Sequence, residues 1–317
     1  MKPVLEINDL LVHIEKNKMI KFNNSSEKER MKKFLEIYNY INIFSLKYLF
    51  ATGNKKILNP NGTFNYVYSY KELRYKDLEK QYKKLLKLEN KMRESVLMYE
   101  TELKSHLIFF LQDFLKIENL DFENLLNSLE SYNPKTKSYI PIDQDFLKFL
   151  NDELITQTKN FSSKPLNYSE YYYILIKVLS FGTIGNFLNY SYKKQMLFTL
   201  FSNYLKRKNN FSIGKQIKNL RTIITLRNSL CHKESLILFL EKGIKRNRKI
   251  KSLKTTKQPI DYLQLRINAI SEIYEYYYNR KNLRKKLKED TWIKNYRKTR
   301  LSNGKNDINF KKIKIDV

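Results

Sequence analysis

The sequence contains few of the residues that interrupt helices. Only 7 glycines and 6 prolines occur among 317 residues, whereas leucine, lysine, glutamate, isoleucine and tyrosine are abundant. Glycine and proline are the residues least compatible with a helix interior. Their scarcity therefore predicts a mainly helical protein.

Cysteine and long apolar runs are scarce as well. The single cysteine, Cys231, cannot form an intramolecular disulfide and suits a reducing compartment. No segment approaches the roughly 18 to 20 uninterrupted apolar residues of a membrane-spanning helix. The first residues also lack a signal-peptide pattern. These absences predict a cytoplasmic protein with no membrane partner.

Acidic residues are outnumbered by basic ones. The chain has 61 Lys and Arg against 32 Asp and Glu, a formal net charge of +29. Such a charge attracts phosphate polyanions or an anionic membrane surface, with nucleic acid as the leading partner. No His or Cys spacing resembles a metal site, and there is no Walker loop or dinucleotide fingerprint. We therefore expect neither a metal nor another cofactor.

Apolar periodicity divides the chain into predicted helices and connections. Helices are expected over about 5–18, 27–50, 70–117, 168–205 with a pause at Gly182 and Gly185, 212–227 and 262–288. Turn formers predict a loop over 51–62, and a connecting insertion with short helices is expected over 119–164. Residues 242–257 are predicted to be a loop, and residues from about Thr299 to be disordered.

The stretch from Leu226 to Lys233 carries the chemistry-bearing residue types. On a helix, Asn228 and His232 share a face, and Arg227 reaches towards them with its long side chain. RNA cleavage needs one group to remove the 2'-hydroxyl proton, one to protonate the leaving 5'-oxygen, and positive charge at phosphorus. The motif contains one histidine, so the two proton transfers require either that His232 acts twice or that a symmetric dimer supplies a second histidine. Alternatively, Arg227 forms a structural ion pair, Asn228 caps a turn and His232 is a polar core residue.

The Arg-Asn-x-x-x-His pattern of Arg227, Asn228 and His232 resembles the signature of the HEPN superfamily of helical ribonucleases. The order of several further segments resembles the abortive-infection AbiD/AbiF family over most of the chain. These segments are Lys2-Pro3, Tyr38 to Asn42, Tyr99-Glu100 with Leu103-Lys104, Leu179 to Thr183, and Leu226 to Asn228 with Cys231-His232.

The resemblance implies an all-α helical bundle of HEPN type with appended basic helical elements. It places an AbiD/AbiF-like region at 1–240, with a core at about 70–118 and 168–240, and a basic C-terminal extension at 241–317. That extension and the aromatic run from Tyr274 to Tyr278 have no counterpart that we can name in the family. The segment Ser180 to Thr183 resembles the family's helix break, with Gly182 allowing a tight backbone approach.

The implied activity is that of a metal-independent endoribonuclease acting as a homodimer. It leaves 2',3'-cyclic phosphate and 5'-hydroxyl ends, acts as a phage-triggered toxin, and has a small RNA as a possible restraining partner. Arg227, Asn228 and His232 take the catalytic positions. Glu100 falls at the family's acidic position, from which it can orient Arg227 or His232; a solvated surface glutamate is the alternative.

Half of the net charge lies in the final quarter of the chain. From Glu241 to Val317 there are 23 Lys and Arg against 8 Asp and Glu. The predicted phosphate contacts are Lys245, Arg246, Arg248, Lys249, Lys251, Arg284, Lys285, Lys286 and Lys288. A solvated basic face is the alternative for these residues.

Two other functions remain open besides the ribonuclease. The chain can be a catalytically silent RNA-binding module of a ribonucleoprotein, in which the motif is structural. A membrane-surface protein is the third option, but no strongly amphipathic basic helix with exposed Trp or Phe supports it.

Overall fold

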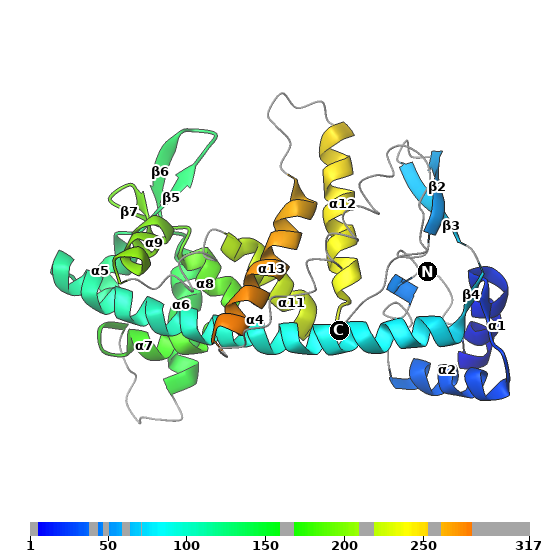
Figure 1. Ribbon diagram of the computed structural model, residues 1–317. Coiled ribbons are helices and arrows are strands. Elements are labelled where there is room, and N and C mark those ends of the chain that lie inside the picture. The colour runs from blue at the N-terminus through cyan, green and yellow to red at the C-terminus, as the bar shows by residue number, and fades with distance from the viewer. Residues whose placement is uncertain are drawn as a thin grey trace. The chain divides into compact units, whose positions relative to one another are not determined.

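The computed structural model describes residues 6–37, 44–46, 51–58, 64–70, 72–158, 168–208, 219–252 and 261–280. Within these ranges the chain is mostly helical with short strands, as the shortage of glycine and proline predicts (Figure 1). Among the described helices, none is both long enough and apolar enough to cross a membrane. The chain forms two compact units, one from the described parts of Met1–Arg93 and Ser229–Ile267, the other from those of Glu94–Asn228 and Asn268–Leu283.

The first unit begins with helices α1 (Ile7–Lys18) and α2 (Ser25–Ile37), separated by the short strand β1 (Ile20–Lys21). The start of α2 is a reciprocal cap. Asn24 Oδ1 accepts the backbone N–H of Glu27 at 2.9 Å, and Glu27 Oε2 accepts that of Asn23 at 2.8 Å. These two hydrogen bonds fix the start of α2. Within the described residues α2 runs to Ile37, and residues 44–46 are helical as well; the other residues of the helix predicted over 27–50 lie outside the described ranges.

Helix α4 (Tyr75–Glu118) contributes to both units. It follows strand β4 (Leu73–Arg74), which pairs in parallel with β1. Four of its apolar residues at helical spacing are at most 1% exposed, namely Leu78, Leu85, Leu103 and Leu107. The sequence therefore predicted this helix correctly, because its apolar spacing has one helical period throughout and no glycine or proline interrupts it.

The predicted loop over 51–62 is wrong for most of its length. Strand β2 (Ala51–Leu58) pairs antiparallel with β3 (Phe64–Tyr70). The turn formers Asn59 to Gly62 lie between the two strands in the sequence, and β3 has an aromatic residue at every second position, a composition that favours strands. The cluster of turn formers thus marks a hairpin connection.

The predicted loop over 242–257 is wrong as far as residue 252, because α12 runs over Leu236–Ser252; residues 253–257 lie outside the described ranges. The basic residues that suggested a loop are good helix formers. Gly243 permits a close approach to α13 (Tyr262–Arg280), since a Cβ atom there would lie 3.1 Å from the Cα of Leu263 and from the carbonyl oxygen of Tyr262. Helix α12 crosses the predicted domain boundary at residue 240; that division stays a prediction.

The second unit contains the rest of α4 and the segment after it. The predicted insertion over 119–164 holds α5 (Phe122–Asn127), the hairpin β5 (Glu130–Asn133) and β6 (Ser138–Pro141), and α6 (Gln144–Thr158). Helices α7 (Tyr168–Val178) and α8 (Phe181–Phe187) follow, then β7 (Ser191–Tyr192), β8 (Gln195–Met196), α9 (Leu197–Arg207) and α11 (Leu220–Cys231). The strands form an antiparallel sheet in the order β6-β5-β7-β8.

Aromatic contacts hold the helices of the second unit on α4. The Tyr99 ring of α4 makes edge contacts with Phe181 of α8 and Tyr276 of α13, at centroid distances of 6.3 and 5.4 Å. Further along α4, Phe110 contacts Phe201 of α9 at 5.4 Å. Five residues at helical spacing along α13 are buried, namely Leu263, Ile267, Ile270, Ile273 and Tyr277. The helix predicted over 262–288 is therefore confirmed as far as Arg280; residues 281–288 lie outside the described ranges.

Candidate functional site

Helix α11 presents Arg227 and Asn228 away from a buried apolar face. Leu220, Ile223 and Leu226 are buried, whereas Asn228 is exposed and Arg227 is partly exposed. The helix lies close to α8 at Gly185, where a Cβ atom would come within 2.5 Å of Ile224 Cδ1. That contact lies one turn before Arg227. The backbone that carries the arginine is therefore fixed by close packing.

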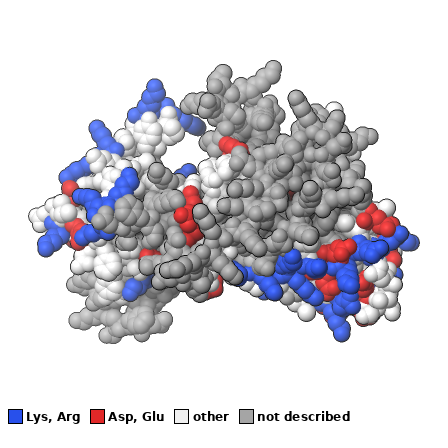
Figure 2. Space-filling model, in the orientation of Figure 1, with Lys and Arg blue, Asp and Glu red and all other residues white. Residues whose placement is uncertain are grey.

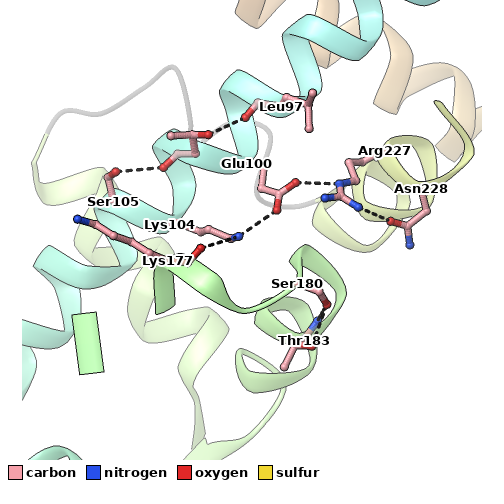
Figure 3. Close-up of polar contacts among 10 residues, drawn as sticks. Leu97, Glu100, Lys104, Ser105, Lys177, Ser180, Thr183, Arg227 and Asn228 are labelled. Atoms are coloured by element: carbon pink, nitrogen blue, oxygen red, sulfur yellow. Dashed lines mark hydrogen bonds and ion pairs between the residues drawn. The ribbon is translucent and has the colours of Figure 1, made fainter. Parts of the chain in front are cut away.

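Glu100 of α4 holds the Arg227 guanidinium. Arg227 Nε donates to Glu100 Oε2 at 2.8 Å, and the carboxylate side chain is only 8% exposed (Figure 3). Charge-assisted hydrogen bonds of this length are among the stronger polar contacts in proteins. The alternative of a solvated surface glutamate is wrong. The predicted role of Glu100 in orienting Arg227 agrees with this contact.

A second cation, Lys104, completes the environment of Glu100. Its Nζ lies 3.0 Å from Glu100 Oε1 and donates to the carbonyl oxygen of Lys177, at the end of α7, at 3.2 Å. Figure 3 shows Glu100 between Arg227 and Lys104. Lys104 had no predicted role. The four-residue spacing of Glu100 and Lys104 on one helix was the signal that could have identified the pair.

The cluster leaves positive charge and donor capacity on Arg227. Two cations surround one carboxylate, so the three side chains together carry one positive charge. Arg227 Nη1 donates to Asn228 Oδ1 at 3.3 Å. A guanidinium has five N–H groups, and within the described part of the chain only these two contacts engage them. The remaining donors can bind a phosphate oxygen.

The end of α11 has the geometry of a Schellman motif. Glu234 N–H donates to the carbonyl oxygen of Ser229 at 2.7 Å, Lys233 N–H donates to that of Leu230 at 3.1 Å, and Lys233 has φ of 55°. The helix therefore ends at Cys231, and His232 lies in the turn that follows, with its side chain exposed. The prediction that Asn228 and His232 share one helical face is therefore wrong, because α11 ends one residue before His232.

Polar contacts in the first unit fix this helix end. Arg93 Nε of α4 donates to the carbonyl oxygen of Leu230 at 3.0 Å. Ser229 Oγ donates to Glu234 Oε2 at 2.7 Å, and Lys242 Nζ lies 2.5 Å from Glu234 Oε1. Burial opposes ionisation of Glu234, but the hydrogen bonds from Lys242 and Ser229 outweigh it, so its pKa lies below the usual value. The turn that carries His232 is thus anchored on both sides.

The four predicted catalytic residues fall into two groups. Glu100, Arg227 and Asn228 belong to the second unit and contact one another, as the ion pair and hydrogen bond show. His232 belongs to the first unit. The alternative of a polar core residue does not hold for His232, because it is exposed. The alternative of an ion pair does hold for Arg227.

The segment Ser180 to Thr183 is a helix start. Ser180 Oγ accepts the backbone N–H of Thr183 at 3.1 Å and caps α8. The predicted break therefore lies at Ser180, and both predicted pause glycines are inside α8. The predicted tight approach at Gly182 is wrong, since a Cβ there would meet only Ser180 Oγ, at 3.7 Å. Gly185 is the glycine that the packing requires.

Two of the nine predicted phosphate contacts have described side chains. Lys245 and Arg246 are exposed on α12, and the Arg246 guanidinium lies 4.1 Å from the centre of the Tyr262 ring. Arg248, Lys249 and Lys251 lie on α12, but their side chains are outside the described part. Arg284, Lys285, Lys286 and Lys288 lie outside the described residues altogether.

Comparison with known proteins gives no match to any protein-family model, curated protein or solved structure. The site therefore has to be interpreted from its own chemistry. The guanidinium of Arg227, which has unused donors, and the neighbouring amide of Asn228 are groups that bind phosphate. The exposed imidazole of His232, four residues after Asn228, is a group that transfers protons.

Proposed function

We propose that the chain is an RNA-binding, metal-independent endoribonuclease of HEPN type, acting as a toxin of phage defence. The observation that carries the proposal is the Arg227 guanidinium, held through Nε by buried Glu100, with further N–H donors available beside exposed Asn228. An arginine oriented in this way can bind a phosphate without losing its position.

The proposed reaction is attack of the ribose 2'-hydroxyl on the adjacent phosphorus. His232 removes the 2'-hydroxyl proton or protonates the departing 5'-oxygen, while Arg227 and Asn228 bind the oxygens of the phosphorane. The products are a 2',3'-cyclic phosphate and a 5'-hydroxyl. Two proton transfers need either two uses of one imidazole or a second imidazole, and a homodimer supplies the second.

Charge supports RNA as the substrate. The net charge of +29 favours a polyanion. Most affinity for RNA then comes from phosphate contacts outside the reaction centre. The wider proposal, that a small RNA restrains the toxin until infection, rests on the AbiD/AbiF resemblance.

The test is a set of alanine variants measured for both cleavage and affinity. We expect His232→Ala and Arg227→Ala to abolish cleavage of a labelled RNA, while affinity changes by less than about threefold. His13→Ala is the control, because this histidine lies on α1 and has no place in the proposed reaction. If the wild-type protein cleaves the RNA and both motif variants cleave it equally well, the assignment is contradicted. In cells, the same variants should relieve growth inhibition.

The silent RNA-binding module remains a second candidate, because one observation favours it. Arg227, Glu100 and Lys104 form a partly buried charge network, which is also what a structural role for the arginine produces. On this hypothesis, Arg227→Ala lowers the melting temperature and the wild type cleaves nothing. The two hypotheses differ most clearly at His232, which is exposed. On the ribonuclease hypothesis, His232→Ala should remove cleavage and leave the melting temperature unchanged.

A further inference from the structure

The N-terminal half of α4 carries a row of lysines that the sequence analysis did not single out. At about 100° per residue, five exposed lysines fall within an arc of about 80° on the helix surface. They are Lys76, Lys80, Lys83, Lys87 and Lys91, and we call them the α4 lysine row. With a rise of about 1.5 Å per residue, the row is about 22 Å long.

Burial of the opposite face of the helix keeps this row of lysines towards solvent. Leu78, Leu85 and Met92 lie on that opposite face and are at most 1% exposed. Rotation of α4 about its axis would expose these apolar side chains and bury the lysines. The lysine row is therefore held towards solvent by the core of the first unit.

Two acidic side chains of the same stretch have partners outside the row. Glu79 is shared between Lys83, at 3.0 Å, and Arg30 of α2, at 3.6 Å. Glu89 is buried and accepts the backbone N–H of Leu236, at the start of α12. In Figure 2, basic side chains lie with acidic ones over the region that α1, α2 and the start of α4 occupy in Figure 1.

The arrangement is unfavourable for an isolated helix. Lys76 and Lys80, Lys83 and Lys87, and Lys87 and Lys91 are all four residues apart, and each like-charge pair of this spacing costs a few tenths of a kcal/mol. A bound polyanion removes this repulsion. The row is one residue wide and several turns long, which fits successive phosphates along one strand.

We propose that the α4 lysine row binds the phosphate backbone of a single RNA strand. The choice of RNA rests on the proposed function. A membrane surface fits less well, because residues 76–91 contain no exposed large apolar side chain, and interfacial helices insert such residues. Contacts to phosphates alone make this binding independent of base sequence.

The test compares two triple variants with equal loss of charge. The first is Lys76→Gln, Lys80→Gln and Lys87→Gln, which leaves the ion pair of Lys83 intact. The control is Lys116→Gln, Lys135→Gln and Lys148→Gln, three exposed lysines of the second unit. Both sets are made in full-length Arg227→Ala protein so that the RNA stays intact. Binding of a labelled 20-nucleotide single-stranded RNA is measured at several salt concentrations.

We expect the row variant to raise Kd at least about tenfold at 0.1 M salt and to reduce the slope of log Kd against log salt by about 2. Each lost single-strand phosphate contact changes that slope by about 0.7. The control should change Kd less than about twofold. Equal losses in both variants, or an unchanged slope in the row variant, overturn the proposal. The proposal is also overturned if the row variant loses binding to phosphatidylserine vesicles while its affinity for RNA is unchanged.

Melting curves of all chains check that the substitutions leave the fold intact, and removal of like charges should not destabilise the row variant. Because this experiment measures binding alone, its result is independent of whether the wild-type protein cleaves RNA. Loss of affinity without any wild-type cleavage would support the row and contradict the ribonuclease.

Discussion

Replacing Glu100 with glutamine should destabilise the second unit strongly. The carboxylate accepts a charge-assisted hydrogen bond from Arg227 at 2.8 Å and forms an ion pair with Lys104 at 3.0 Å, in a site where its side chain is only 8% exposed. Hydrogen bonds to charged groups contribute about 1.5 to 3 kcal/mol each. Glutamine keeps one acceptor oxygen and turns an N–H₂ group towards the other cation. We therefore expect a loss of about 2 to 4 kcal/mol.

The magnitude is below that for a fully buried ion pair because Arg227 is 26% exposed and water can partly replace the carboxylate. The Lys104 side chain is 13% exposed, and in the variant it still donates a hydrogen bond to the carbonyl oxygen of Lys177. The assay is urea unfolding followed by circular dichroism, with the free energy of unfolding obtained by linear extrapolation. Glu123→Gln, at an exposed position of α5, is the control and should cost less than about 0.5 kcal/mol.

A double-mutant cycle separates the pair from general effects of substitution. Lys104→Met should cost less in the Glu100→Gln background than in the wild type, by more than about 1 kcal/mol, because the two residues contact each other. Additive effects would contradict a coupling between Glu100 and Lys104. A loss below about 0.5 kcal/mol for Glu100→Gln would contradict a stabilising role for the whole network.

Three further predictions concern the packing and the helix ends. Gly185→Ala should destabilise by about 1 kcal/mol, because the new Cβ would lie 2.5 Å from Ile224 Cδ1; Ile224→Val removes that atom and should restore stability in the double variant, as thermal unfolding would show. Lys233→Gly should stabilise by about 0.5 to 1 kcal/mol, because the residue has φ of 55°, and an unchanged or lowered melting temperature would contradict this. Burial raises the pKa of Glu89 from 4.5 to about 7 in spite of its hydrogen bond from Leu236 N–H. The folded state therefore binds a proton between these pH values that the unfolded state releases, so stability should fall by up to about 3 kcal/mol as pH rises from 4.5 to 7. Glu89→Gln should remove this part of the pH dependence, and an unchanged slope would refute the argument.

The sequence predicted elements that depend on one regular period. Helices α4 and α13 carry apolar residues at helical spacing over many turns, and their buried faces agree with that spacing. The hairpin β2–β3 does not follow from the turn formers alone, because the same residue types occur in loops and in connections between paired strands. Helix α12 does not follow from charge, because a run of basic residues is compatible with a solvated loop and with a helix.

The site was predictable where it depends on residue type and spacing. Arg227 and Asn228 came from one short motif, and Glu100 from a resemblance to a family. Their contact across 127 residues of sequence depends on how α4 packs against α11, which no local pattern specifies. The end of α11 at Cys231 depends on backbone hydrogen bonds in which a lysine takes the left-handed position usually occupied by glycine. Composition gave no indication of it.

Incubation of the purified wild-type chain with an RNA in the presence of EDTA tests the central claim most directly. The ribonuclease account predicts cleavage without added metal and fragments that end in a 2',3'-cyclic phosphate and begin with a 5'-hydroxyl, resolved by mass spectrometry. Intact RNA across all substrates tried, or fragments that begin with a 5'-phosphate, would contradict it.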